Sequence, residues 1–185
     1  IHLETAEMAL EAGLKAQAQA SLTRGSAIIQ FLAEPRFLAW SLYLRSQLEE
    51  PSPADLQLAA AYEIAKNLDC PELQWQILWR LSDRAGAAGN ARMQEDLTWS
   101  ALTILSKLAE PLQPTDATPF WRQGARRAFV EQAQRRYGPQ FLQMVMLGGT
   151  EAPDVTDLHL RGLGWDPSLI PEFIRKNMPS GVEPA

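Results

Sequence analysis

The amino-acid sequence predicts an all-α fold built from stacked helical hairpins, and three observations lead to this prediction. Through residue 147, long stretches rich in Ala, Leu, Gln and Glu alternate with prolines, and runs of β-branched residues are few, which favours helix over strand. Within these stretches apolar residues recur at helical spacing. A short segment ending in proline also recurs along the chain, as expected of stacked supersecondary units.

Residues 71 to 110 carry the pattern of one hairpin most clearly. Each half has apolar residues at steps of about three and four, which is the buried stripe of an amphipathic helix. Between the halves, Gly86, Gly89 and Asn90 can adopt the left-handed conformation that ends a helix. The two stripes are Leu73, Ile77, Leu78 and Leu81, beside Trp75 and Trp79, and then Met93, Leu97, Ala101, Ile104, Leu105 and Leu108.

Three segments of the chain share one pattern: Ile, three residues, Leu, two residues, Pro. They end at Pro35, Pro71 and Pro111, so the repeat distances are 36 and 40 residues. Proline lacks a backbone donor and disfavours helix in the residue before it, so it can close one helix and open the next. The first two prolines are followed by a helix with an early aromatic, Trp40 or Trp75. The repeating unit is therefore predicted to be a helix pair.

These features resemble the tetratricopeptide repeat family over about residues 5 to 111. The matching positions are the early aromatics Trp40 and Trp75, the terminal prolines, and small residues where paired helices would touch, Ala59, Ala60, Ala61 and Ala101. The spacing is longer than the usual repeat, and the Leu-Gly pair expected after the aromatic is absent. The chain is similar to the divergent, longer repeats of bacterial signalling ATPases and transcriptional activators. The resemblance implies a right-handed α-solenoid of antiparallel helix pairs.

The chain is expected to divide into three regions. Residues 1–111 would form the helical repeats, and 112–148 a capping region, which repeat arrays need to cover their last apolar face. In that region Pro114, Asp116 and Pro119 predict a loop, followed by an amphipathic helix from Phe120 to about Tyr137, with the apolar residues 141 to 147 continuing or following it, so that one or two capping helices are expected. Residues 149–185 are rich in Pro and Gly, yet too apolar for a free linker, so they are expected to be a loop-rich tail that folds back on the helices.

Charge and cysteine content argue against several functional classes. The formal net charge is −5 and the isoelectric point about 5.1, which argues against general nucleic-acid or membrane-surface affinity. No apolar run approaches the length of a membrane span. With Cys70 as the only cysteine, no intrachain disulfide can form, and a reducing, cytoplasmic location is expected. Because Ile1 is not an initiator methionine, we expect the chain to be either part of a longer protein or a trimmed chain.

No catalytic constellation is found in the sequence. The only histidines are His2 and His159, so a histidine-rich metal site is not available. Cys70 stands directly before a repeat proline, where it is expected to pack as a small hydrophobe rather than act as a nucleophile. A glycine-rich phosphate loop and a nucleophile elbow are both missing. The sequence thus predicts no catalytic residue, no metal and no cofactor.

The leading functional hypothesis is a non-catalytic scaffold or regulatory module that binds a peptide, a helix or another domain of a longer parent chain. The binding groove would be lined by the first helices of successive pairs, at residues 37 to 49 and 72 to 83. Most of the six tryptophans would fill seams between helices, and any exposed one would mark the binding surface. The predicted groove contacts are Tyr43, Arg45, Gln74, Gln76 and Arg80.

A strip of arginines in the predicted helix 120–137 suggests a second surface. Glu131 is the only carboxylate that opposes it. Arginine forks pair bidentately with carboxylates and phosphates, so the strip could hold an anionic partner, although a solvated outer face is the favoured interpretation. Two alternatives to a scaffold stay open: a nucleic-acid-linked or transcription regulator that uses this strip, and an enzyme with an unrecognised site. The strip consists of Arg122, Arg126, Arg127, Arg135 and Arg136.

Overall fold

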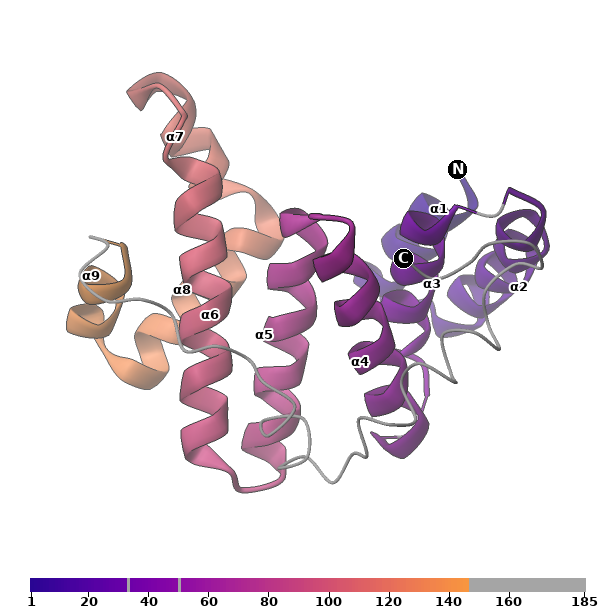
Figure 1. Cartoon of the computed structure of the whole chain (residues 1–185), viewed down its shortest axis with the longest axis horizontal. Coiled ribbons are helices and arrows are strands. Elements are labelled where there is room, and N and C mark those ends of the chain that lie inside the picture. Colours follow the sequence, from indigo (N-terminus) through magenta and orange to yellow (C-terminus); the bar gives the residue numbers. More distant parts are fainter. Residues whose placement is uncertain (33, 50, 147–185) are drawn as a thin grey trace. The chain divides into compact units, whose positions relative to one another are not determined.

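A computed structural model describes residues 1–32, 34–49 and 51–146, and every regular element in these residues is an α-helix (Figure 1). The all-α prediction is confirmed for this part of the chain. The described residues form two compact units, one of residues 1–73 and the other of residues 74–146. The helices are α1 (His2–Glu11), α2 (Lys15–Leu32), α3 (Pro35–Arg45), α4 (Pro51–Asn67), α5 (Pro71–Ala87), α6 (Ala91–Ala109), α7 (Pro114–Arg122), α8 (Gly124–Tyr137) and α9 (Pro139–Met146).

The first unit has a core made largely of alanine and leucine. Helix α1 packs against α2 and α3, and α3 packs against α4. Small side chains let these helices approach closely: a Cβ added at Gly25 of α2 would lie 3.4 Å from the Cβ of His2 on α1. Helix α3 is covered on most of its sides, since six of its eleven residues are buried. The buried apolar residues of the unit include Leu3, Ala6, Ala18, Leu22, Leu38, Leu42, Leu58 and Ala60.

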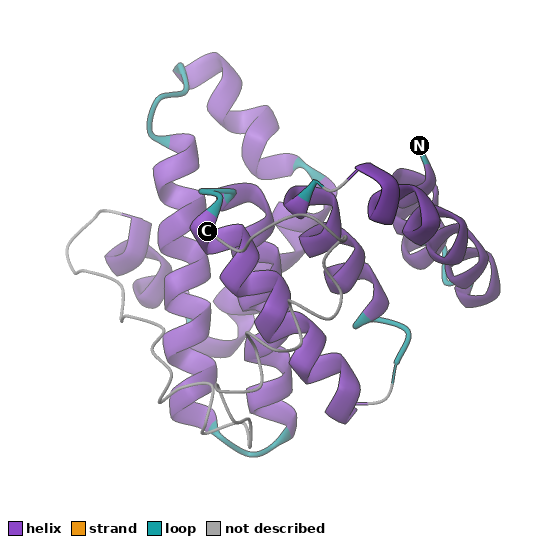
Figure 2. Cartoon of the chain, turned by 45° about the vertical axis from the view of Figure 1, so that its right-hand side comes forward, coloured by secondary structure: helices purple, strands orange, loops and turns teal. Residues whose placement is uncertain are grey.

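In the second unit α5 and α6 form a helical hairpin, with the short loop that Figure 2 shows between them. Gly89 has a φ of +78°, a conformation that glycine adopts without strain. The side chain of Asn90 then caps α6 by accepting a hydrogen bond from the backbone N–H of Met93 at 3.2 Å. Ser82 of α5 and Thr98 of α6 are hydrogen-bonded at 2.7 Å between their hydroxyls. The two helices and the turn predicted in residues 71 to 110 are therefore confirmed.

Several prolines stand where helices begin. Pro35 and Pro71, two of the three repeat prolines, are the first residues of α3 and α5, as predicted. The first turn of a helix tolerates proline because its N–H would have no intrahelical partner there. Pro111 differs, because it lies in the turn after α6 and the next helix begins three residues later, at Pro114.

The capping region differs from the prediction in two respects. The predicted loop at Pro114, Asp116 and Pro119 is helical and forms most of α7. Proline has a helical φ, so Pro114 fits the first turn of α7, and Pro119 removes only one backbone donor. The single helix predicted from Phe120 to Tyr137 is also wrong, because Gln123 has an extended backbone, with ψ of 135°, and separates α7 from α8. The glycine that follows is a poor helix former. The predicted tail, 149–185, lies outside the described residues.

Candidate functional site

Two of the predicted groove residues lie on α3, in the first unit. Tyr43 is only 5% exposed, so its ring is buried within the unit, and its contribution to a binding groove stays a prediction. Arg45 is partly buried, and its guanidinium donates a hydrogen bond to the hydroxyl of Ser26 on α2. Both side chains therefore contribute to the packing of this unit.

The other predicted groove residues lie on α5, in the second unit. Gln74, Gln76 and Arg80 are all partly exposed. The guanidinium of Arg80 lies over the ring of Trp79, 5.5 Å from its centroid, at the distance of a cation–π contact. These three residues can reach solvent, and their contribution to a binding groove stays a prediction.

Five arginines of the predicted strip are distributed over two helices and are held differently. Arg122 ends α7, and the other four lie on α8. Arg126 stacks on Phe120 with its guanidinium 4.0 Å from the ring centroid. Arg127 donates from Nε to Glu131 at 2.7 Å, and Arg136 lies 3.8 Å from Asp83 of α5. The five arginines therefore do not form a continuous row of solvent-exposed charges.

The ion pair between Arg127 and Glu131 shifts the pKa of both groups. The hydrogen bond from Arg127 and the charge of that guanidinium lower the pKa of Glu131, with a smaller contribution from Arg135. The same hydrogen bond and the negative charge of Glu131 raise the pKa of Arg127. Both groups are surface-exposed, so solvent screens the pair and its contribution to stability is small.

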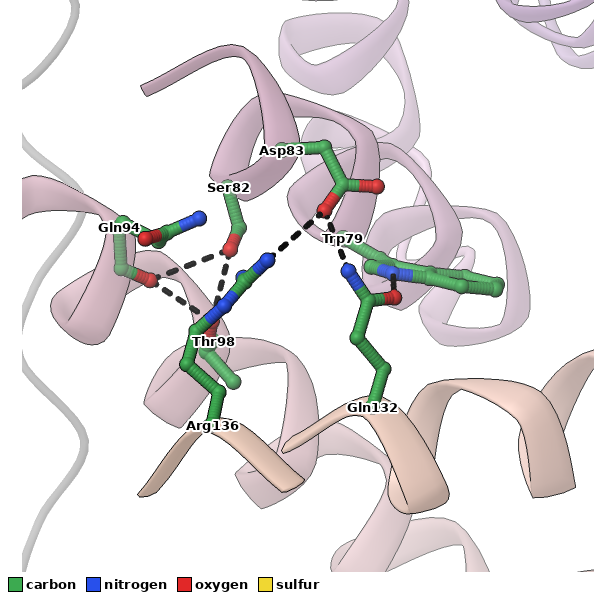
Figure 3. A network of polar contacts seen from close by, with 7 residues as sticks. All are labelled: Trp79, Ser82, Asp83, Gln94, Thr98, Gln132 and Arg136. Carbon is green, nitrogen blue, oxygen red and sulfur yellow. Dashed lines mark hydrogen bonds and ion pairs between the residues drawn. The ribbon is translucent and has the colours of Figure 1, made fainter. Parts of the chain in front are cut away.

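A polar network joins α5 to α8 (Figure 3). Gln132 of α8 accepts a hydrogen bond from the indole N–H of Trp79 and donates one to Asp83, each at 2.7 Å. Arg136, one helical turn further along α8, approaches the same Asp83 oxygen at 3.8 Å. Sequence reasoning missed this network, because residues about 50 positions apart carry no spacing signal for one another. It orients α8 on the hairpin and explains why Arg136 is not a free cation.

Two aromatic clusters fill seams of the second unit. Trp75, Trp79 and Phe129 stack with centroids 5.2 to 6.1 Å apart. Trp99 and Tyr137 both contact Phe141 of α9, at 5.5 and 4.6 Å. Such separations are those of favourable ring pairs. Trp75, Trp79 and Trp99 therefore have the seam-filling role predicted for most tryptophans.

A surface hollow lies at the corner where α7 ends and α8 begins. It is open to solvent and has a volume of about 650 Å³. Arg122 forms no hydrogen bond or ion pair with any residue that the structure describes. The hollow thus combines an unpaired cation, the Glu131-bound guanidinium of Arg127 and the partly exposed indole of Trp121. Its lining consists of Ala117, Thr118, Trp121, Arg122 and Arg127.

An exposed apolar surface lies at the end of α2, in the first unit. Phe31 is 87% exposed, and its neighbours Ile28 and Leu32 are 45% and 52% exposed. Phe37 follows in the first turn of α3 at 37%. None of these residues is among the contacts predicted from the sequence. The signal was available: Phe31 falls on the opposite side of α2 from the buried line of Leu22 and Ile29.

The described residues contain no group of three or more His, Cys, Asp or Glu side chains placed to hold a metal ion. Cys70 is partly buried, with its sulfur 3.7 Å from the backbone oxygen of Leu68. His2 lies on α1, beside Gly25 of α2, and His159 falls outside the described residues. Nor is any helix in the described ranges long and apolar enough to cross a membrane.

Comparison of the chain with protein-family models, with curated proteins and with solved structures found no match. The similarity to tetratricopeptide repeats therefore stays a prediction from the sequence.

Proposed function

We propose that this chain is a non-catalytic protein-binding module, and that the exposed face of α2 takes up an amphipathic helix of a partner protein or of another domain in a longer parent chain. The observation that carries this proposal is the exposure of Phe31, at 87%, beside the half-exposed Ile28 and Leu32. Large apolar side chains gathered at one place on a protein surface are typical of interaction sites.

Helix α2 is apolar on two opposite sides. Its buried line runs through Ala18, Leu22 and Ile29 and faces the unit's own core. About 180° around the helix, a second line is fully exposed. Both lines follow steps of four and seven residues, which place side chains on one face of a helix. A surface helix needs only one such face to hold its own unit together, so the second is available to a partner. The second line consists of Ala16, Ala20, Ala27 and Phe31.

The exposed line suits a helix better than an extended strand. Three alanines allow another helix to approach closely, and Phe31 at the end provides a large side chain that can fill a gap between side-chain ridges of the partner. Full burial of a large apolar side chain contributes about 1.5–3 kcal/mol. Phe31 would gain nearly all of this, whereas Ile28 and Leu32 are already half covered. Phe31 is therefore the expected hot spot of the interface.

The alternative of nucleic-acid binding has weaker support. Arg126, Arg127 and Arg136 already interact with Phe120, Glu131 and Asp83 within the second unit. The chain as a whole has a net charge of −5, and phosphate backbones are bound by an excess of cations.

A photo-crosslinking experiment tests the proposal. p-Benzoylphenylalanine, a phenylalanine with a photoreactive benzoyl group on its ring, is placed at the exposed Phe31 and, as a control, at the exposed Gln134 of α8. A partner crosslinked from position 31 but not from 134 is identified, the crosslinked segment is mapped, and that segment is synthesised as a peptide. We expect the peptide to be helical when bound.

The affinity of that peptide for the whole chain is then measured by fluorescence anisotropy. Phe31→Asp is expected to weaken binding about tenfold or more, equivalent to 1.4 kcal/mol, while Gln134→Asp leaves it unchanged. The proposal fails if position 31 crosslinks nothing beyond the Gln134 control or only a second copy of the chain. It also fails if the peptide binds the Phe31→Asp variant with unchanged affinity.

A further inference from the structure

The hollow between α7 and α8 exists because the chain turns at Gln123. Helix α7 stops at Arg122, Gln123 is extended, and α8 starts at Gly124 in a new direction. The last turns of α7 supply Trp121 and Arg122, and the first turn of α8 supplies Arg127. Residues close in sequence thus form a concave surface that a single continuous helix would not have.

The cations of the hollow differ in availability. Arg122 is exposed and has no partner among the described residues, so its whole guanidinium fork is available. Nε of Arg127 donates a hydrogen bond to Glu131. The two terminal nitrogens of Arg127 form no hydrogen bond or ion pair with any other described residue. Guanidinium groups bind carboxylates and phosphates through two parallel N–H groups, a geometry that gives specificity as well as attraction.

The rest of the lining is apolar or neutral. Trp121 is held in place by an edge-to-face contact with Phe120, at 5.1 Å between centroids. Phe120 in turn carries the guanidinium of Arg126 at 4.0 Å, so the ring that contacts Trp121 is itself restrained from two sides. An indole wall beside a free arginine matches a ligand with an anionic group next to an apolar one. The volume of about 650 Å³ lies within the range of sites that bind small ligands or side chains.

We propose that this hollow binds a short acidic peptide segment, with a carboxylate of the peptide on Arg122 and an adjacent apolar side chain against Trp121. A peptide with one or two carboxylates meets little repulsion from the chain's net charge of −5, whereas a nucleic acid, with a charge on every nucleotide, meets much more. This site lies in the second unit and is independent of the helix-binding face proposed for α2. Either can fail without the other.

Binding is tested with a short fluorescein-labelled peptide that has two glutamates, each followed by a leucine, and with the same peptide carrying glutamine in place of glutamate. Anisotropy with the whole chain measures affinity, and ¹⁵N spectra of the arginine side chains locate the contact. We expect saturable binding of the glutamate peptide only, with shifts of the Arg122 Nε–Hε signal larger than those of Arg92.

Matched variants separate the site from general charge. Arg122→Gln and Arg92→Gln remove the same charge, and Arg92 is exposed at the start of α6, outside the hollow. Arg122→Gln is expected to weaken binding about fivefold, since an exposed charge pair contributes up to about 1 kcal/mol, while Arg92→Gln changes it little. Glu131→Gln, which frees Arg127, is expected to tighten binding.

Three results would overturn the proposal: equal binding of the glutamine peptide, equal loss in the two arginine variants, or tighter binding of a short oligonucleotide than of the glutamate peptide at the same salt concentration. Circular dichroism of Arg122→Gln checks that α7 and α8 stay folded. Arg122→Lys keeps the charge without the fork, so it is expected to recover only part of the affinity if the pairing is bidentate.

Discussion

Gln132 and Trp79 are joined by a hydrogen bond of 2.7 Å from the indole N–H to the side-chain oxygen, and the amide nitrogen of Gln132 donates to Asp83 at the same distance. One amide thus satisfies a donor and an acceptor on α5 at once. Because these groups are partly buried, removing the amide leaves the indole N–H of Trp79 without a partner among the described residues and leaves Asp83 with the longer contact to Arg136, at 3.8 Å. This side chain therefore supports the attachment of α8 to the hairpin, together with the ring contacts of Phe129 to Trp75 and Trp79.

Gln132→Ala is therefore expected to lower the free energy of unfolding by about 1–3 kcal/mol, the cost of leaving buried polar groups unsatisfied. Urea denaturation measures the change. Gln134→Ala, at an exposed position on the same helix, is the control and is expected to change stability by less than about 0.5 kcal/mol. Equal losses in the two variants would mean that the network contributes nothing beyond helix propensity.

Substitutions of Trp75 test whether the packing of its ring or its indole N–H decides the stability of the chain. It is 0% exposed, and its indole nitrogen has no hydrogen-bond partner among the described residues. Trp75→Ala is expected to cost about 3–5 kcal/mol through the cavity it leaves. Trp75→Phe keeps a ring on Phe129 and removes the unsatisfied donor, so its cost is expected to be much smaller. A Phe variant as unstable as the Ala variant would contradict this account.

Gly86 tests how closely α5 and α6 pack. A Cβ at this position would collide with the side chain of Gln94 on α6, while alanine is favoured over glycine within a helix by about 0.8–1 kcal/mol. In a Gln94→Ala background, Gly86→Ala is expected to stabilise the chain by roughly this amount. In the wild-type background the gain is expected to be smaller or reversed. Thermal unfolding of the four proteins of this double-mutant cycle measures the coupling.

The raised pKa of Glu7 predicts the direction in which folding stability changes with pH. Partial burial, followed by the charges of Glu11 and Glu4, raises its pKa above the ordinary value of 4.5. A carboxyl with a raised pKa in the folded state contributes stability that is present below pH 4.5 and is lost as pH rises through its folded pKa.

Glu7→Gln is therefore expected to raise the melting temperature at pH 7 and to leave it nearly unchanged at pH 3.5. The gain should be roughly 0.5 kcal/mol or less, because the side chain is half exposed and solvent screens it. The exposed Glu95→Gln on α6 serves as control. A stabilisation that is equal at both pH values would contradict the assignment to ionisation.

The parts of the fold that the sequence predicts are those indicated by residues close to one another in the chain. The stripes of α5 and α6, the glycine turn between them and the prolines at the starts of α3 and α5 are all short-range signals. The region after residue 112 was predicted less well, because proline is read as a helix breaker although Pro114 stands where a helix accepts it. The stop at Gln123 has no sequence signal stronger than one neighbouring glycine.

The candidate sites are less predictable, because they depend on which faces the fold covers. Helix α3 is apolar on nearly all sides, so periodicity could not indicate whether Tyr43 points inward, and the structure buries it. Arg136 pairs with Asp83, on a helix that no spacing rule connects to α8. The exposure of Phe31 was not predicted, because the sequence pattern around it indicates only the repeat that ends at Pro35.

The distribution of tryptophans has a spectroscopic consequence. Among the described residues, Trp40 is the only tryptophan of the first unit, whereas Trp75, Trp79, Trp99 and Trp121 all belong to the second. Emission from the described tryptophans, excited at the indole band, therefore reports mainly on the second unit. A variant that keeps Trp40 and replaces the others by phenylalanine would make the first half visible on its own, so the unfolding of the two halves can be followed as separate optical signals.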